Sequence, residues 1–296
     1  MLENNRMVQA SYEGNKPSLA SIIMMPFLFT LMLSIGNVLS ELIGSLLFNN
    51  LEESLFRIYM QYFQYAASFA LAGAVVVLFM CKVQGKNWRS IGLFKEKAVV
   101  SYFKGAGIAF LGIVAIISFL QFKGELTISA IPINRGVHLF GIILIILIAW
   151  IIQGAAEELF LRGFMFQAIT VRYDVYKGII IPAIVFALLH LGNNGINAIS
   201  LINILLCGLA LMLLVLKDGN LWGAFGFHTA WNLLQGNVFG ISISGNTMDV
   251  SLFKTVIQTD TIWSGGAFGL EGSLLTTLFF ILASLVLVRQ LSKHNR

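Results

Sequence analysis

Charged residues are scarce in this chain of 296 residues. Asp, Glu, Lys and Arg together make up 11% of it, whereas hydrophobic residues make up 57% and the mean hydropathy is +0.84. Soluble domains carry about one quarter charged residues, so this composition excludes an ordinary soluble domain and favours a membrane protein. Cysteine is almost absent as well. Cys81 and Cys207 lie in apolar runs without Cys-x-x-Cys spacing, which excludes a disulfide framework and a thiolate metal site.

The net charge of +5 does not indicate a nucleic-acid partner, because the basic residues are scattered between the apolar runs. They are better interpreted as topology signals of a protein whose partner is the lipid bilayer. The sequence does not indicate the oligomeric state.

Eight apolar segments qualify as transmembrane helices, each of which needs roughly twenty residues. We therefore predict an all-α polytopic membrane bundle with about eight transmembrane helices in a single domain, 1–296. A polar N-terminal tail, 1–20, precedes the helices, and the motifs below lie in a core at 150–235. The segments run near Ile22–Phe48, Tyr59–Cys81, Val99–Phe122, Val137–Gly154, Gly178–Leu189, Ile196–Leu216, Leu221–Leu234 and Ser273–Val288, the fifth and seventh being short.

The positive-inside rule predicts an N-in and C-in orientation, which requires an even number of helices. With the N-terminus inside, only Arg57, Lys123, Arg135 and Lys254 fall in outer segments. The inner segments hold Arg6, Lys16, Lys82, Lys86, Arg89, Lys95, Lys97, Lys104, Arg162, Arg172, Lys177, Lys217, Arg289, Lys293 and Arg296.

Two adjacent carboxylates, Glu157 and Glu158, follow an uncharged run of Ile, Leu and Trp. A charge at bilayer depth is costly, so such residues are functional candidates. Glu158 and Arg162 lie four residues apart and can pair on one helix face. A packing salt bridge explains that pair, but Glu157 points about 100° away and has no obvious local partner. Desolvation should make Glu157 a competent base near neutral pH.

Two further helices carry polar pairs spaced four residues apart. Phe186 and His190 share a face after Pro182, and His228 and Asn232 share another. Imidazole and amide donors aimed in one direction suit an oxyanion site. The alternatives are a satisfied core histidine and polar contacts that hold helices together.

Depth along the helices favours function over these alternatives. At about 1.5 Å per residue, Glu157 lies roughly 22 Å from Arg172, and His190 roughly 20 Å from Lys177. His228 falls at a similar depth, so three helices place their polar groups at one level. Small residues beside the motifs allow close helix contact and a cavity: Gly154, Ala155, Ala156, Gly223, Ala224 and Gly226.

These motifs resemble the CAAX protease and bacteriocin-processing (CPBP, or Abi) family, which includes the Ras-converting CAAX endopeptidase. The matching residues are Glu157-Glu158-x-x-x-Arg162, Phe186-x-x-x-His190 and His228-x-x-x-Asn232, in the family's order. The turn Trp88–Leu93 and the glycine-rich stretch 265–272 are also similar to bacterial members. The resemblance implies an eight-helix intramembrane peptidase.

By motif position, the resemblance implies that Glu157 and His190 activate a water and that His228 and Asn232 hold the oxyanion. Glu158 and Arg162 would support the first glutamate. No cofactor is favoured. Zinc bound by Glu157, His190 and His228 is the alternative, although the chain lacks His-Glu-x-x-His.

Other classes of function stay open. A proton-coupled transporter could use buried carboxylates and histidines, but no inverted repeat is present. A non-catalytic scaffold or bacteriocin-immunity protein is the other alternative. We expect peptide, lipidated or membrane-protein substrates in a bacterial plasma membrane, reached from the cytoplasmic side. Glu271, before the last helix, is expected to be a solvated loop carboxylate, and the segment Gln235–Gly272 an outer loop packed partly on the bundle.

Overall fold

The computed structural model describes residues 2, 4–130 and 138–294. Three residues used in the topology prediction, Arg135, Val137 and Arg296, lie outside this part of the chain. The described residues form a helical fold with a single two-stranded antiparallel sheet. The all-α prediction is therefore confirmed apart from this small sheet.

The helices follow the predicted segments closely. They are α1 (Arg6–Ser11), α2 (Leu19–Phe48), α3 (Glu53–Leu78), α4 (Ala98–Phe122), α5 (Leu139–Glu158), α6 (Phe166–Arg172), α7 (Val175–Leu189), α8 (Ala198–Asp218), α9 (Trp222–Asn232) and α10 (Leu274–His294). Short π-helical segments extend α3 (Phe79–Val83), join α5 to α6 (Leu159–Met165) and extend α9 (Leu233–Val238).

Six helices in the described part of the chain are long and apolar enough to cross a membrane. They are Leu19–Phe48, Glu53–Val83, Ala98–Phe122, Leu139–Arg172, Ala198–Asp218 and Leu274–Lys293. The two predicted segments that do not reach this length are α7, with 15 residues, and α9, with 11. They are the same two that the sequence marks as short. The protein is therefore an integral membrane protein.

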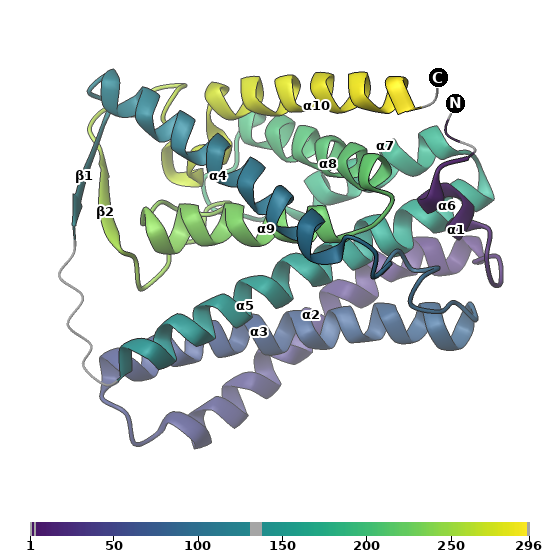
Figure 1. Ribbon diagram of the computed structural model, residues 1–296. Coiled ribbons are helices and arrows are strands. Elements are labelled where there is room, and N and C mark those ends of the chain that lie inside the picture. The colour runs from purple at the N-terminus through teal and green to yellow at the C-terminus, as the bar shows by residue number, and fades with distance from the viewer. Residues whose placement is uncertain (1, 3, 131–137, 295–296) are drawn as a thin grey trace.

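The helices pack as a bundle in which α3 contacts α2 and α5, and α9 contacts α5 and α4. On the other side, α8 contacts α7 and α10. Figure 1 shows both chain termini at one end of this bundle and the strands β1 (Leu126–Ala130) and β2 (Phe253–Ile257) at the opposite end. The strands pair antiparallel, with Leu126 opposite Ile257 and Ala130 opposite Phe253.

Small residues bring α9 against its neighbours, as the sequence predicts. A Cβ atom on Gly154 of α5 would lie 3.1 Å from the backbone nitrogen of Thr229 and 3.2 Å from the Cβ of His228. On the other face of α9, a Cβ on Gly226 would come within 1.9 Å of the carbonyl oxygen of Tyr102 in α4. The contact at Gly226 leaves no space for a Cβ, whereas the contact at Gly154 is tight and favours a small residue. The contact at Gly154 places His228 directly beside α5.

The segment predicted as a polar tail contains a folded element, α1. Its Met7 side chain is fully buried, and α1 packs against α6 and α8 at the end of the bundle that holds the termini. The Lys86 ammonium donates hydrogen bonds to the carbonyl oxygens of Ala10 and Ser11. Burial lowers the pKa of Lys86 to about 8. The N-terminal segment is therefore anchored to the first loop after α3.

Candidate active site

The predicted pair of Glu158 and Arg162 is present and completely enclosed. Arg162 Nη1 lies 2.7 Å from Glu158 Oε1, and the two side chains are 2% and 0% exposed. Arg162 Nη2 also donates to the carbonyl oxygen of Gly208 in α8, at 3.1 Å. The pair therefore links the end of α5 to α8. The second carboxylate oxygen of Glu158, Oε2, has no hydrogen-bond partner in the described part of the chain.

The second partner of Glu158 is His228. The Nδ1 atom of His228 lies 2.9 Å from Glu158 Oε1, while its Nε2 atom lies 3.4 Å from Glu157 Oε2. The imidazole thus sits between the two carboxylates. The sequence predicts that Glu158 and Arg162 support Glu157. In the structure, Arg162 contacts Glu158, and Glu158 contacts the His228 ring. That ring in turn contacts Glu157.

Glu157 does have a local partner, so the prediction that it has none is wrong. Gln153, one helical turn earlier, donates from Nε2 to Glu157 Oε1 at 2.8 Å. The Oε1 atom of Gln153 accepts a hydrogen bond from Asn232 Nδ2 at 2.9 Å. The spacing of four residues between Gln153 and Glu157 is the signal that could have identified this residue. Gln153 connects the two motif helices.

His190 directly follows the last residue of α7 and lies one helical turn after Phe186. Its Nδ1 atom lies 2.8 Å from the carbonyl oxygen of Phe186, which leaves Nε2 as the free ring nitrogen. The Phe186 ring packs edge-on against both imidazoles, with centroids 4.8 Å from His190 and 6.3 Å from His228. Among the described residues, no hydrogen bond joins His190 to Glu157.

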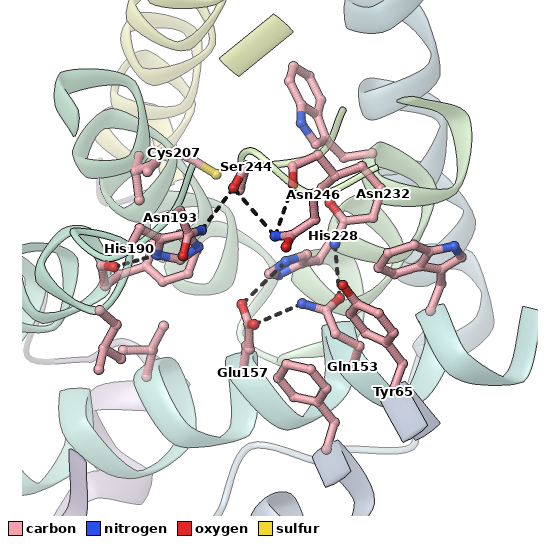
Figure 2. A pocket seen from close by; sticks show the side chains of 18 of the residues that line it. Tyr65, Gln153, Glu157, His190, Asn193, Cys207, His228, Asn232, Ser244 and Asn246 are labelled. Carbon is pink, nitrogen blue, oxygen red and sulfur yellow. Dashed lines mark hydrogen bonds and ion pairs between the residues drawn. The ribbon is translucent and has the colours of Figure 1, made fainter. Parts of the chain in front are cut away.

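Glu157, His190, His228 and Asn232 nevertheless line one cavity of about 590 Å³. In Figure 2, Glu157 lies at the floor of the pocket, joined by dashed lines to His228 and Gln153, and His190 lies across from it beside Asn193. The four residues come from three separate helices, as the sequence predicts. Glu158 and Arg162 lie behind them in the packed interior.

Comparison with known protein families bears on the same segment. Residues 139–234 match the model of type II CAAX prenyl endopeptidase Rce1-like proteins. This Rce1-like segment begins at α5 and ends just after Asn232, so it contains all three motifs. The predicted resemblance to the CAAX protease family is thus confirmed over this part of the chain. No curated protein and no solved structure matches the chain.

The zinc alternative would need Glu157, His190 and His228 to converge on one point. A catalytic zinc ion takes three protein ligands at about 2.0–2.2 Å. Within the part of the chain that the structure describes, no three His, Cys, Asp or Glu side chains gather in this way. His228 Nε2 and Glu157 Oε2 lie 3.4 Å apart, whereas no hydrogen bond or ion pair joins His190 to either residue in the described part of the chain.

Glu271 lies outside the Rce1-like segment and is not the solvated carboxylate that the sequence predicts. It lines the same cavity and is only partly exposed. Ser244 donates to its carboxylate from both the backbone nitrogen and Oγ, and Trp231 donates from Nε1. The segment Gln235–Gly272 therefore packs on the bundle, as expected, and also supplies part of the pocket wall.

Proposed function

We propose that this protein is an intramembrane endopeptidase that hydrolyses peptide bonds of membrane-associated protein or peptide substrates. The observation that carries the proposal is the convergence of Glu157, His190, His228 and Asn232 on one cavity within a helical membrane bundle. The match of the surrounding segment to a family of prenyl endopeptidases supports it. Substrates with lipid anchors or transmembrane segments suit a site enclosed by apolar helices.

Glu157 acts as the general base in this proposal. Its Oε1 atom is fixed by Gln153, and the carboxylate faces the cavity, where it can take a proton from a water molecule. A base positioned in this way contributes about 10²–10⁴-fold to a rate. His190, with Nδ1 held by Phe186, presents Nε2 to the cavity and helps to orient the water. The hydroxide then attacks the carbonyl carbon, and Glu157 returns the proton to the leaving amine.

His228 and Asn232 stabilise the oxyanion that forms during this attack. Asn232 Nδ2 carries two hydrogens, and its bond to Gln153 uses one of them, so a second remains to donate. His228 is held in orientation by the buried Glu158 carboxylate, which accepts from Nδ1. In this proposal the ring is an imidazolium whose Nε2 donates into the space beside Glu157. Removing one well-placed oxyanion donor costs about 3–4 kcal/mol of transition-state stabilisation. All steps use side chains of this chain, without a metal.

Two measurements test the peptidase proposal. Purified protein in liposomes is incubated with membrane-anchored peptides, and new peptide termini are identified by mass spectrometry. In cells, membrane peptides are compared between strains with and without the intact gene. Cleavage in both settings supports the proposal. Intact peptides throughout, with a folded protein, would reject it in favour of a non-catalytic scaffold.

We propose that eight helices, α2 to α5 and α7 to α10, cross the membrane in alternating directions. Both termini then lie in the cytoplasm of a bacterial cell. The fifteen basic residues predicted for the inner segments, against four for the outer ones, support this orientation. The placement of both termini at one end of the bundle is consistent with it (Figure 1).

This orientation does not by itself determine from which side of the membrane a substrate reaches the cavity. The lining residues Gln61, Gln64 and Tyr65 belong to the half of α3 nearer Glu53, and Asn246 lies in the loop after α9. With the termini inside, this is the outer half of the bundle, whereas α1 packs at the inner end. The cytoplasmic access predicted from the sequence is therefore not supported by the position of the cavity. We propose instead that it is reached from the outer half.

A labelling experiment distinguishes the two routes. Cys81 and Cys207 are replaced by serine, and a cysteine is introduced at Asn246. Labelling of intact cells by a membrane-impermeant maleimide supports outer access. Labelling only after the cytoplasmic face is exposed would support access from the cytoplasm instead.

A further inference from the structure

The glycine-rich stretch 265–272 has no part in the proposed water activation, yet it delivers a carboxylate into the same cavity. Gly265 and Gly269 have φ angles of 85° and 93°, which side chains other than glycine rarely adopt. A Cβ on Gly269 would lie 1.9 Å from the carbonyl oxygen of Ser242. These glycines let the chain turn against the loop that carries Ser242 and Ser244, and the turn directs Glu271 into the cavity.

Contacts on several sides fix Glu271. The Oε2 atom accepts hydrogen bonds from the backbone nitrogen and Oγ of Ser244, both at 2.6 Å, and Oε1 accepts one from Trp231 Nε1 at 3.1 Å. Asn203 of α8 donates to the carbonyl oxygen of Glu271 at 2.8 Å. Ser244 adopts a φ of 45°, and such strain is usually maintained at functional positions. Burial raises the pKa of the Glu271 carboxyl, and the three donors oppose this shift by stabilising the ionised form.

The cavity offers this carboxylate no permanent positive charge. Its lining contains Glu157 and Glu271 but neither lysine nor arginine, in the part of the chain that the structure describes. The buried Arg162 pairs with Glu158, and Glu157 faces His228. His190 lines the same cavity, and an imidazole carries a positive charge only when it is protonated. Two carboxylates at one apolar-walled pocket produce a negative potential that attracts a cation.

We propose that Glu271 forms a subsite for a positively charged side chain, lysine or arginine, of the substrate peptide. This proposal rests on the peptidase function proposed above. The cavity of about 590 Å³ has room for an extended peptide segment, and Asn193 and Asn246 line it as neutral hydrogen-bonding groups. The same negative potential repels a free C-terminal carboxylate at this position. Cleavage is therefore directed to bonds near a basic residue inside a chain.

The test compares peptides that differ at one position only. A membrane-anchored host peptide carries lysine, norleucine or glutamate at each position flanking the cleaved bond, and the full-length protein cleaves it in liposomes. At one position, wild type should prefer lysine over norleucine by at least about tenfold in kcat/KM. Glu271→Gln should reduce this ratio to near one, and Glu271→Asp should retain part of it. Glu53→Gln, an exposed carboxylate at the start of α3, is the matched control.

The outcomes separate the subsite from other roles of Glu271. If Glu271→Gln slows the cleavage of all peptides equally and keeps the ranking, Glu271 positions His190 instead, and the subsite proposal is overturned. If the ranking of wild type does not depend on charge, the proposal is also overturned, although the peptidase function stands. If wild type cleaves nothing, the peptidase function fails. The subsite is then judged by binding of the lysine and norleucine peptides to wild type and Glu271→Gln, where equal binding overturns it.

Discussion

The Nδ1 atom of His228 lies 2.9 Å from Oε1 of Glu158, an atom that also receives the Arg162 guanidinium at 2.7 Å. Glu158 thus has two tasks. It balances the charge of a fully buried arginine, and it fixes the imidazole ring that faces Glu157. These tasks can be separated by mutation, because only one of them requires a carboxylate next to His228.

Glu158→Gln is expected to destabilise the protein strongly. The substitution leaves Arg162 buried without a counter-charge, and breaking a buried pair in this way costs about 3–5 kcal/mol. Thermal unfolding in detergent should show a clear fall in Tm, and turnover should be lost with it.

The double variant Glu158→Gln with Arg162→Met isolates the second task. Removing both charges should restore most of the Tm, since no unpaired ion remains. Turnover should stay low, because His228 has still lost its carboxylate anchor. Recovery of wild-type turnover by the double variant would show that Glu158 does not orient His228 for the reaction.

Gln153→Leu should reduce turnover while the protein remains folded. Glu157 and Asn232 both lose a hydrogen-bond partner, and misplacement of catalytic groups by about 1 Å can cost about 100-fold in rate. The same change at the exposed Gln121 of α4 is the control and should leave turnover at the wild-type level. Wild-type turnover by Gln153→Leu would show that Gln153 does not position the catalytic groups.

Two glycines in α4 give a matched pair for testing the helix packing. A Cβ on Gly105 would lie 1.8 Å from the carbonyl oxygen of Gly223 in α9, whereas a Cβ on Gly107 has nothing within 4 Å. Gly105→Ala should therefore lower the Tm and the turnover, because α9 carries His228. Gly107→Ala should lower neither the Tm nor the turnover, because alanine favours the helix more than glycine does. Equal behaviour of the two variants would contradict the close contact of α4 with α9.

Metal chelators should leave the activity unchanged. The proposed mechanism uses Glu157 and His190 to activate water without a bound ion. Turnover in liposomes is measured before and after treatment with a strong zinc chelator and dialysis. A loss of activity that added zinc restores would contradict the metal-free mechanism.

Much of the site could be predicted because it depends on spacing along single helices. The pair of Glu158 and Arg162 and the shared face of Phe186 and His190 follow from the four-residue period of a helix. The convergence of three helices on one cavity could be predicted from their depths. Polar residues are so rare in this chain that each one within an apolar run is informative.

Other features could not be predicted, because they depend on how distant segments meet. The contact of Glu158 with His228 requires α5 and α9 to cross at Gly154, and the sequence does not specify that crossing. Glu271 enters the pocket because of the turns at the preceding glycines and its bonds to Ser244. The pairing of Leu126 with Ile257 joins strands far apart in the chain. None of these contacts has a local periodicity.

The most direct test of the central claim is the turnover of Glu157→Gln in liposomes, with Glu53→Gln as the control. The glutamine keeps the size of the side chain and its hydrogen bond to Gln153 but cannot take a proton. The account predicts a fall of at least about 100-fold in kcat with an unchanged Tm, while the control cleaves like wild type. Turnover of Glu157→Gln at the wild-type rate would contradict it.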